Sequence, residues 1–176
     1  MANKNNHVVI SYFSGADKAD AAANQLKDWD KANDAVKLGG IGILVWDEGK
    51  IQTRKVGGRS TGSGAKWGTI LGVTTGILTG GVTLIGGAVA GAAGGAVLGS
   101  FFHKSLGLSD EDEARLEKNL EGGQAALVVM ADEDEIAATS EELKSLGGEV
   151  ESYEIPEETM DAAQAAEDVK PAEPSE

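Results

Sequence analysis

Residues 67–102 have the sequence WGTILGVTTGILTGGVTLIGGAVAGAAGGAVLGSFF and contain no ionisable side chain. Glycine recurs at every fourth position in two series that flank Gly81: Gly64, Gly68, Gly72, Gly76 and Gly80, then Gly87, Gly91, Gly95 and Gly99. Glycine inside a helix costs about 1 kcal/mol relative to alanine, so an ordinary soluble helix does not accumulate it. Glycines four residues apart share one helix face and allow another backbone to approach closely. The stretch predicts two glycine-zipper helices joined by a glycine turn.

The composition excludes several kinds of site. The 176 residues include no cysteine, which rules out disulfides, thiolate metal sites and thiol nucleophiles. The first residues, MANKNNH, lack the apolar core of a signal peptide. We therefore expect the protein on the cytoplasmic side of the inner (plasma) membrane, or in a cytoplasmic assembly.

Charge is distributed unevenly along the chain. Residues 1–104 carry 11 Lys/Arg and 7 Asp/Glu, whereas residues 105–176 carry 4 and 22. Five cations precede the apolar stretch with no acid between them: Lys50, Arg54, Lys55, Arg59 and Lys66. Such a run is either a positive-inside or anionic-lipid signal, or a solvated strand face followed by a loop. The acidic remainder argues against nucleic acid as a partner.

Outside the apolar stretch, the pattern predicts alternating strands and helices. Strands are expected at 7–13, 41–46, 50–56 and 125–131, with an edge strand at 149–155. One helix is expected after the first strand, with Asp17 as its cap, and a second begins at the capping box of Ser109 and Asp112. A third is expected from residue 132. The expected core comprises Val9, Leu26, Ile43, Leu127 and Val129.

This order predicts an α+β fold. The first six elements match a ferredoxin-like βαββαβ sandwich, with a glycine-zipper α-helical hairpin inserted and an extra αβ unit at the end. The predicted domains are the split α/β domain at 1–58 and 105–155, the inserted segment at 59–104, and an acidic disordered tail at 156–176. Both ends of the inserted segment are expected at one edge of the sheet, and only a hairpin leaves both halves of that sheet on one side of a membrane.

The length of the hairpin leaves its relation to a membrane open. At 1.5 Å per residue, the first arm reaches roughly 20 Å and the second roughly 31 Å, against a hydrocarbon core of about 30 Å. The hairpin can span the bilayer, enter one leaflet, or stay out of lipid and pack on copies of itself. Aromatic and basic residues at its two ends resemble interfacial anchors or else pack on the α/β domain: Lys66, Trp67, Phe101, Phe102 and Lys104.

The placement of the zipper after a strand hairpin at 41–56 resembles the domain-of-unknown-function 1269 family of bacterial predicted membrane proteins. The similarity covers about residues 7–155. The resemblance implies a small α/β domain interrupted by a glycine-rich hairpin, together with membrane association. It implies no established activity and no catalytic residues.

No arrangement of residues predicts catalysis, a cofactor or a metal site. His7 and His103 have no predicted partner, and residues 132–135 (DEDE) lack the spacing of a calcium loop and are better explained as a helix start. Residues 60–66 superficially resemble a phosphate loop but lack the glycine before Lys66.

The sequence therefore favours a non-enzymatic, self-assembling, membrane-associated structural protein, with lipid and other copies of itself as partners. The alternative is a soluble homo-oligomeric module that binds a small ligand or regulator, with the hairpin buried in the assembly. In that case Gln52, Arg54 or Lys55 would line an open face of the sheet.

Overall fold

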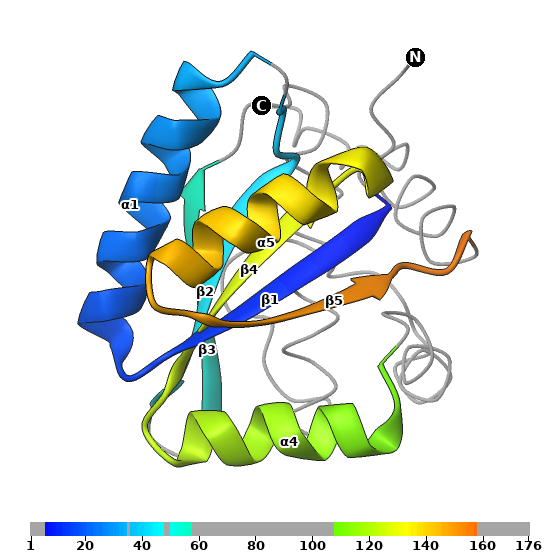
Figure 1. The fold of residues 1–176 in the computed structure, drawn as a ribbon. Coiled ribbons are helices and arrows are strands. Elements are labelled where there is room, and N and C mark those ends of the chain that lie inside the picture. The colour runs from blue at the N-terminus through cyan, green and yellow to red at the C-terminus, as the bar shows by residue number, and fades with distance from the viewer. Residues whose placement is uncertain (1–5, 35, 48–49, 58–107, 158–176) are drawn as a thin grey trace, which may run out of the picture.

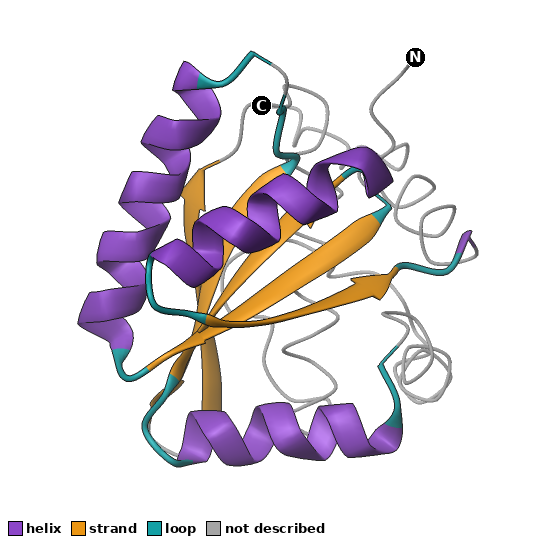
Figure 2. Ribbon diagram, in the orientation of Figure 1, coloured by secondary structure: helices purple, strands orange, loops and turns teal. Residues whose placement is uncertain are grey.

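The computed structural model describes residues 6–34, 36–47, 50–57 and 108–157. The elements follow in the order β1 (His7–Phe13), α1 (Ala16–Ala32), β2 (Gly40–Asp47), β3 (Lys50–Gly57), α4 (Asp110–Glu121), β4 (Ala125–Ala131), the 3₁₀ turn η1 (Glu133–Glu135), α5 (Ile136–Ser145) and β5 (Glu149–Glu154). All five strands form one antiparallel sheet in the order β3-β2-β4-β1-β5 (Figure 2). The predicted α+β class is confirmed.

The strand order corrects the predicted assignment of the first six elements. That assignment places the third strand between the first and second, whereas β3 pairs with β2 at one edge and β4 holds the central position. The last helix and strand, expected as an extra unit, are integral because β5 pairs with β1. Composition explains the difference: all seven residues of β4 are buried, as a central strand requires, whereas β3 carries three cations and suits an edge.

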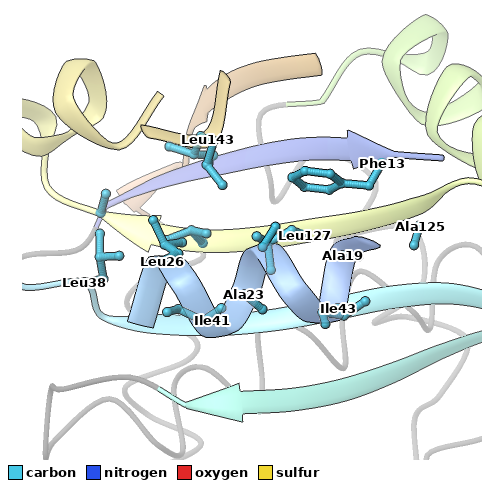
Figure 3. Packing of buried hydrophobic residues seen from close by; sticks show 14 of the residues in the cluster. Phe13, Ala19, Ala23, Leu26, Leu38, Ile41, Ile43, Ala125, Leu127 and Leu143 are labelled. Atoms are coloured by element: carbon cyan, nitrogen blue, oxygen red, sulfur yellow. The ribbon is translucent and has the colours of Figure 1, made fainter. Parts of the chain in front are cut away.

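Helices cover both faces of the sheet (Figure 1). α1 and α5 lie on one face, where Val9, Leu26, Ile43, Leu127 and Val129 are all fully buried, so the predicted core is confirmed. Figure 3 shows several side chains of this layer between α1, α5 and the sheet. Burying side chains of this size contributes about 1.5–3 kcal/mol each and is the main source of stability.

α4 covers the opposite face of the sheet. Its inward residues Leu116 and Leu120 are fully buried beside Val8, Ile10 and Met130. Strand alternation divides β1 between the two layers, because neighbouring side chains point to opposite faces. Among the described residues, every helix is too short or too polar to span a bilayer.

The helix starts agree with the sequence at two of three places. Ser109 accepts from the Asp112 backbone N–H at 3.2 Å and its own N–H donates to Asp112, completing the predicted capping box. The start predicted from residue 132 is also a capping box, and it opens η1 before α5. The cap predicted at Asp17 is wrong: α1 begins at Ala16, and Asp17 lies in its first turn, where a carboxylate favours the helix dipole.

The inserted segment joins opposite edges of the sheet rather than one edge. Before it, Gly57 ends the edge strand β3 and pairs with Ile41. After it, α4 begins beside the other edge, since Arg115 in its second turn contacts Glu151 and Tyr153 of β5. The expectation of a shared edge is therefore wrong, and its cause is the outer position of β3.

Candidate functional site

The zipper and interface residues predicted from sequence lie outside the described residues. This holds for all nine zipper glycines and for Lys66, Trp67, Phe101, Phe102 and Lys104. His103 also lies outside them.

Among the described residues, polar side chains gather where α4 meets β1 and β5. We call this group the Arg115 cluster: Tyr12, Asp112, Arg115, Glu151 and Tyr153. Strand alternation aligns Glu151 and Tyr153 on the α4 side of β5, opposite Ile10 and Val8 of β1. Asp112 and Arg115 are three residues apart and share one side of α4.

Hydrogen bonds in the Arg115 cluster converge on Glu151. Tyr153 Oη donates to Glu151 Oε2 at 2.8 Å, and Tyr12 Oη donates to the same oxygen at 3.4 Å. The guanidinium of Arg115 lies 2.8 Å from Glu151 Oε1 and donates to Tyr153 Oη at 3.2 Å. It also donates to Asp112. Both carboxylate oxygens of Glu151 thus have polar partners: Oε1 contacts Arg115 of α4, and Oε2 accepts from Tyr12 of β1 and Tyr153 of β5.

The electrostatics of the cluster fix its protonation state. Burial, and then the charge of Glu151, raise the pKa of Tyr12 far above its usual range. Burial, and then the hydrogen bond to Glu151, do the same for the pKa of Tyr153. The hydroxyl of Ser109, which donates to Asp112 at 2.7 Å, lowers the pKa of that carboxyl. Near neutral pH, Tyr12 and Tyr153 are therefore neutral phenols, Arg115 is a guanidinium cation and Asp112 is a carboxylate.

This chemistry suits a clamp better than an acid–base centre. A general acid or base works best with a pKa near the operating pH, whereas the tyrosine pKa values move away from neutrality. Arg115 already has two carboxylate partners, Asp112 and Glu151. The cluster fastens the start of α4 to the edge strand β5.

In the part of the chain that the structure describes, no group of three or more His, Asp or Glu side chains is arranged to hold a metal ion.

Two buried carboxylates, Glu135 and Asp30, stabilise the connection between α1 and β2. Glu135 is 5% exposed and accepts from the backbone N–H of Lys37 at 2.6 Å and of Asp132 at 3.0 Å. Asp30, 2% exposed, accepts from the N–H of Leu38 at 3.0 Å. Both carboxylates satisfy backbone donors, which explains their burial as structural.

Close packing beside β1 requires a glycine at position 148. A Cβ there would overlap Ser11 Oγ and lie 2.8 Å from the ring of Phe13. Ser11 is fully buried, and neither its hydroxyl nor that of Thr139 has a hydrogen-bond partner among the described residues. Two unsatisfied hydroxyls therefore lie in the layer that α5 covers.

The other residues considered from sequence have ordinary surroundings. His7 is half-buried in β1, and its Nδ1 lies 3.1 Å from Asn6 Oδ1. The carboxylate of Glu135 belongs to the η1 capping box, in agreement with a helix start. In β3, Gln52, Arg54 and Lys55 take register positions beside Val45, Ile43 and Gly42 of β2.

Sequence reasoning missed the Arg115 cluster. Arg115 and Lys118 are the only cations between residues 105 and 143, among many carboxylates. This excess of acids was a signal that one of the two cations binds a carboxylate distant in sequence. The partner itself was not identifiable, because Glu151 is one of many carboxylates in this half of the chain.

The chain matches a known sequence family over more than half of its length. A sequence family described as "Protein of unknown function (DUF1269)" matches residues 62–167, which include part of the inserted segment and the elements from α4 to β5. No curated protein and no solved structure matches the chain.

Proposed function

The chain belongs to the DUF1269 family of proteins of unknown function, and from its own residues we propose that it is a non-enzymatic, self-assembling structural protein that contacts the membrane through residues 59–104. The observation that carries this proposal is the four-residue glycine spacing within a stretch free of ionisable side chains. Small residues at this spacing allow the close backbone contact that drives helix association in lipid.

The sheet supports a segment that leaves the α/β domain and returns to it. β3 precedes the inserted segment and β4 follows it, and both belong to one sheet on either side of β2. A single membrane crossing would place the two strands on opposite sides of the bilayer and break that sheet. An even number of crossings, or none, keeps it intact.

The separation of the two attachment points is compatible with a hairpin. Neighbouring strands lie about 4.8 Å apart, so the sheet is roughly 19 Å wide from β3 to β5. An extended chain reaches about 3.3 Å per residue, so residues 58–63 alone can cover roughly that distance. The two arms can therefore pack together although their attachments lie at opposite edges.

In this proposal, the ends of the hairpin lie at the cytoplasmic interface of the inner (plasma) membrane. Lys66 and Trp67 flank the entry, and Phe101, Phe102 and Lys104 flank the exit. Aromatic rings favour the headgroup level, and cations favour the cytoplasmic side.

The fold also supports a revised ferredoxin-like assignment, which we propose for the strands β2-β4-β1-β5 with α1 and α5. β1-α1-β2 encloses β4, and β4-α5-β5 encloses β1, so two split βαβ units interlock. β3 and α4 are then the additions that flank the inserted segment.

Cysteine labelling tests the hairpin, because the natural chain has no cysteine. Ser63→Cys and Ser105→Cys place one thiol at each end of the inserted segment, and Ser145→Cys, at an exposed position at the end of α5, marks the side of the α/β domain. In spheroplasts and inverted vesicles, all three thiols should react with an impermeant maleimide from the same side.

Labelling of Ser63→Cys and Ser105→Cys from opposite sides would contradict the hairpin. Recovery of the protein as a monodisperse soluble species after fractionation would favour the alternative, a soluble binding module. A carbonate-resistant membrane pellet supports the proposal.

A further inference from the structure

We propose that the two edge strands of the sheet, β3 and β5, bind each other between copies of this chain, so that the sheet continues from one copy to the next. This surface is separate from the glycine zipper and does not depend on it.

Within the described residues, the outer sides of both edge strands have no strand paired to them. β3 pairs with β2 and β5 pairs with β1, and no further strand within the described ranges lies beside either one. An edge strand presents unpaired N–H and C=O groups, which another strand can satisfy. The sheet therefore has two surfaces of the same chemical kind at its opposite ends.

Charge distinguishes the two edges. β3, KIQTRKVG, carries three cations and no acid, whereas β5, EVESYE, carries three carboxylates and no cation. Glu149 and Glu154 are exposed, and Glu151 is bound to Arg115. Opposite charges on neighbouring strands stabilise a pairing and like charges destabilise it. Contacts of β3 with β3, or of β5 with β5, are therefore disfavoured, and β3 with β5 is favoured.

Strand direction gives the geometry of the contact. Four antiparallel pairings separate β3 from β5, so the two edge strands run in the same direction. A second copy shifted sideways by one sheet width presents its β5 parallel to β3 of the first, with α1 and α5 on the same face. Because two different surfaces meet, the contact repeats and produces an open chain or a closed ring.

The acidic tail is a competing occupant of the β3 edge. Residues 156–176 carry seven carboxylates and one lysine. The experiment must therefore distinguish three causes of an effect at β3: pairing with β5 of another copy, binding of the acidic tail, and a general effect of net charge.

Charge reversal of each edge tests the pairing in the full-length chain. The β3 variant carries Lys50→Glu, Arg54→Glu and Lys55→Glu, and the β5 variant carries Glu149→Lys and Glu154→Lys. Glu151 is kept because it binds Arg115. In sedimentation equilibrium, each variant alone should associate at least about tenfold more weakly than the natural chain, and added salt should weaken the natural association.

A mixture of the two variants is the decisive arm. The reversed β3 of one variant complements the reversed β5 of the other, so the mixture should recover association that neither variant shows alone. Recovery also demonstrates that both variants are folded. The control is the double variant Asp34→Lys/Glu141→Lys, which replaces two exposed carboxylates that lie away from the edge strands. Its net charge changes by the same amount as that of the β5 variant, and it should associate like the natural chain.

Three results would overturn the edge pairing. These are unchanged association of both reversed variants, failure of their mixture to recover it, and loss of the β3 effect once residues 158–176 are removed, which would assign that edge to the tail. Repeating the series with Gly91→Leu/Gly95→Leu separates the two proposals, because the edge effects should persist when zipper packing is lost.

Discussion

The guanidinium of Arg115 on α4 lies 2.8 Å from the carboxylate of Glu151 on β5, and this contact joins the helix after the inserted segment to the last strand of the sheet. Tyr12 of β1 donates to the same carboxylate, so three elements distant in sequence meet at one side chain. The chain has two tyrosines, and both belong to this cluster.

Arg115→Met should lower the melting temperature, but by less than Leu116→Ala. Arg115 is 47% exposed, and ion pairs open to solvent contribute little, whereas truncating a buried leucine costs about 2–5 kcal/mol. Thermal unfolding followed by circular dichroism measures both. Lys118→Met, at another exposed cation of α4, is the matched control; an equal loss from it would remove the special role of the Arg115 pair.

Stability should fall as the pH rises above about 10, where tyrosine ordinarily ionises. Folding raises the pKa of both tyrosines, so their stabilising effect is complete below the unfolded value and is lost as pH rises from that value toward the folded one. The slope for Tyr12 is at most about 1.4 kcal/mol per pH unit, and solvent screening makes the slope for the more exposed Tyr153 smaller. Tyrosinate absorbance reports on the cluster alone, and Glu151→Gln should shift its titration to lower pH. A titration at the ordinary pH in the natural protein would refute the buried network.

Gly148→Ala should destabilise the fold by about 1–3 kcal/mol, because the added methyl group overlaps Ser11 Oγ and approaches Phe13. Ser11→Ala alone should be neutral or stabilising, because it removes a buried hydroxyl without a partner among the described residues. In urea unfolding, the double variant should recover part of the loss, which a double-mutant cycle measures. Strict additivity would indicate that the clash with Ser11 is not the cause.

Gly91→Leu/Gly95→Leu should weaken self-assembly. Leucine raises helix propensity and apolarity but adds bulk where a neighbouring backbone is expected, so packing and insertion respond in opposite directions. Cross-linking in detergent measures the loss, and Ala93→Leu on the opposite face of an ideal helix is the control. The α/β domain should stay folded, since Val9, Leu26 and Ile43 are unchanged. Assembly that survives both substitutions would refute the packing role.

Truncation after Ile155 should leave stability within about 0.5 kcal/mol of the full chain, because the removed residues carry acids and small side chains. Ile155 itself must stay: it is 2% exposed, and its N–H donates to the Asn6 carbonyl at 2.7 Å. Thermal unfolding checks the result. A large loss of stability would reveal a docking role for the tail, with the basic run from Lys50 to Lys66 as the expected surface.

Local patterns predicted the elements well because periodicity and capping act within a few residues. Leu26 was correctly predicted as a core residue of α1, and Ser109 with Asp112 located the start of α4. Pairing was harder, since any of several strands can lie beside β1. The fully apolar β4 and the charged β3 contained the information needed, because only an edge tolerates Lys50, Arg54 and Lys55 on one strand. The partners of Arg115 depend on that pairing and could not be derived before it.

The central position of β4 delays formation of the sheet during synthesis, because the first strands have to wait for it. β1 and β2 do not pair with each other; both pair with β4, which begins at Ala125. Residues 67–102 therefore leave the ribosome while the strands before them still lack their shared partner. The apolar segment is therefore exposed on the nascent chain before the sheet can form.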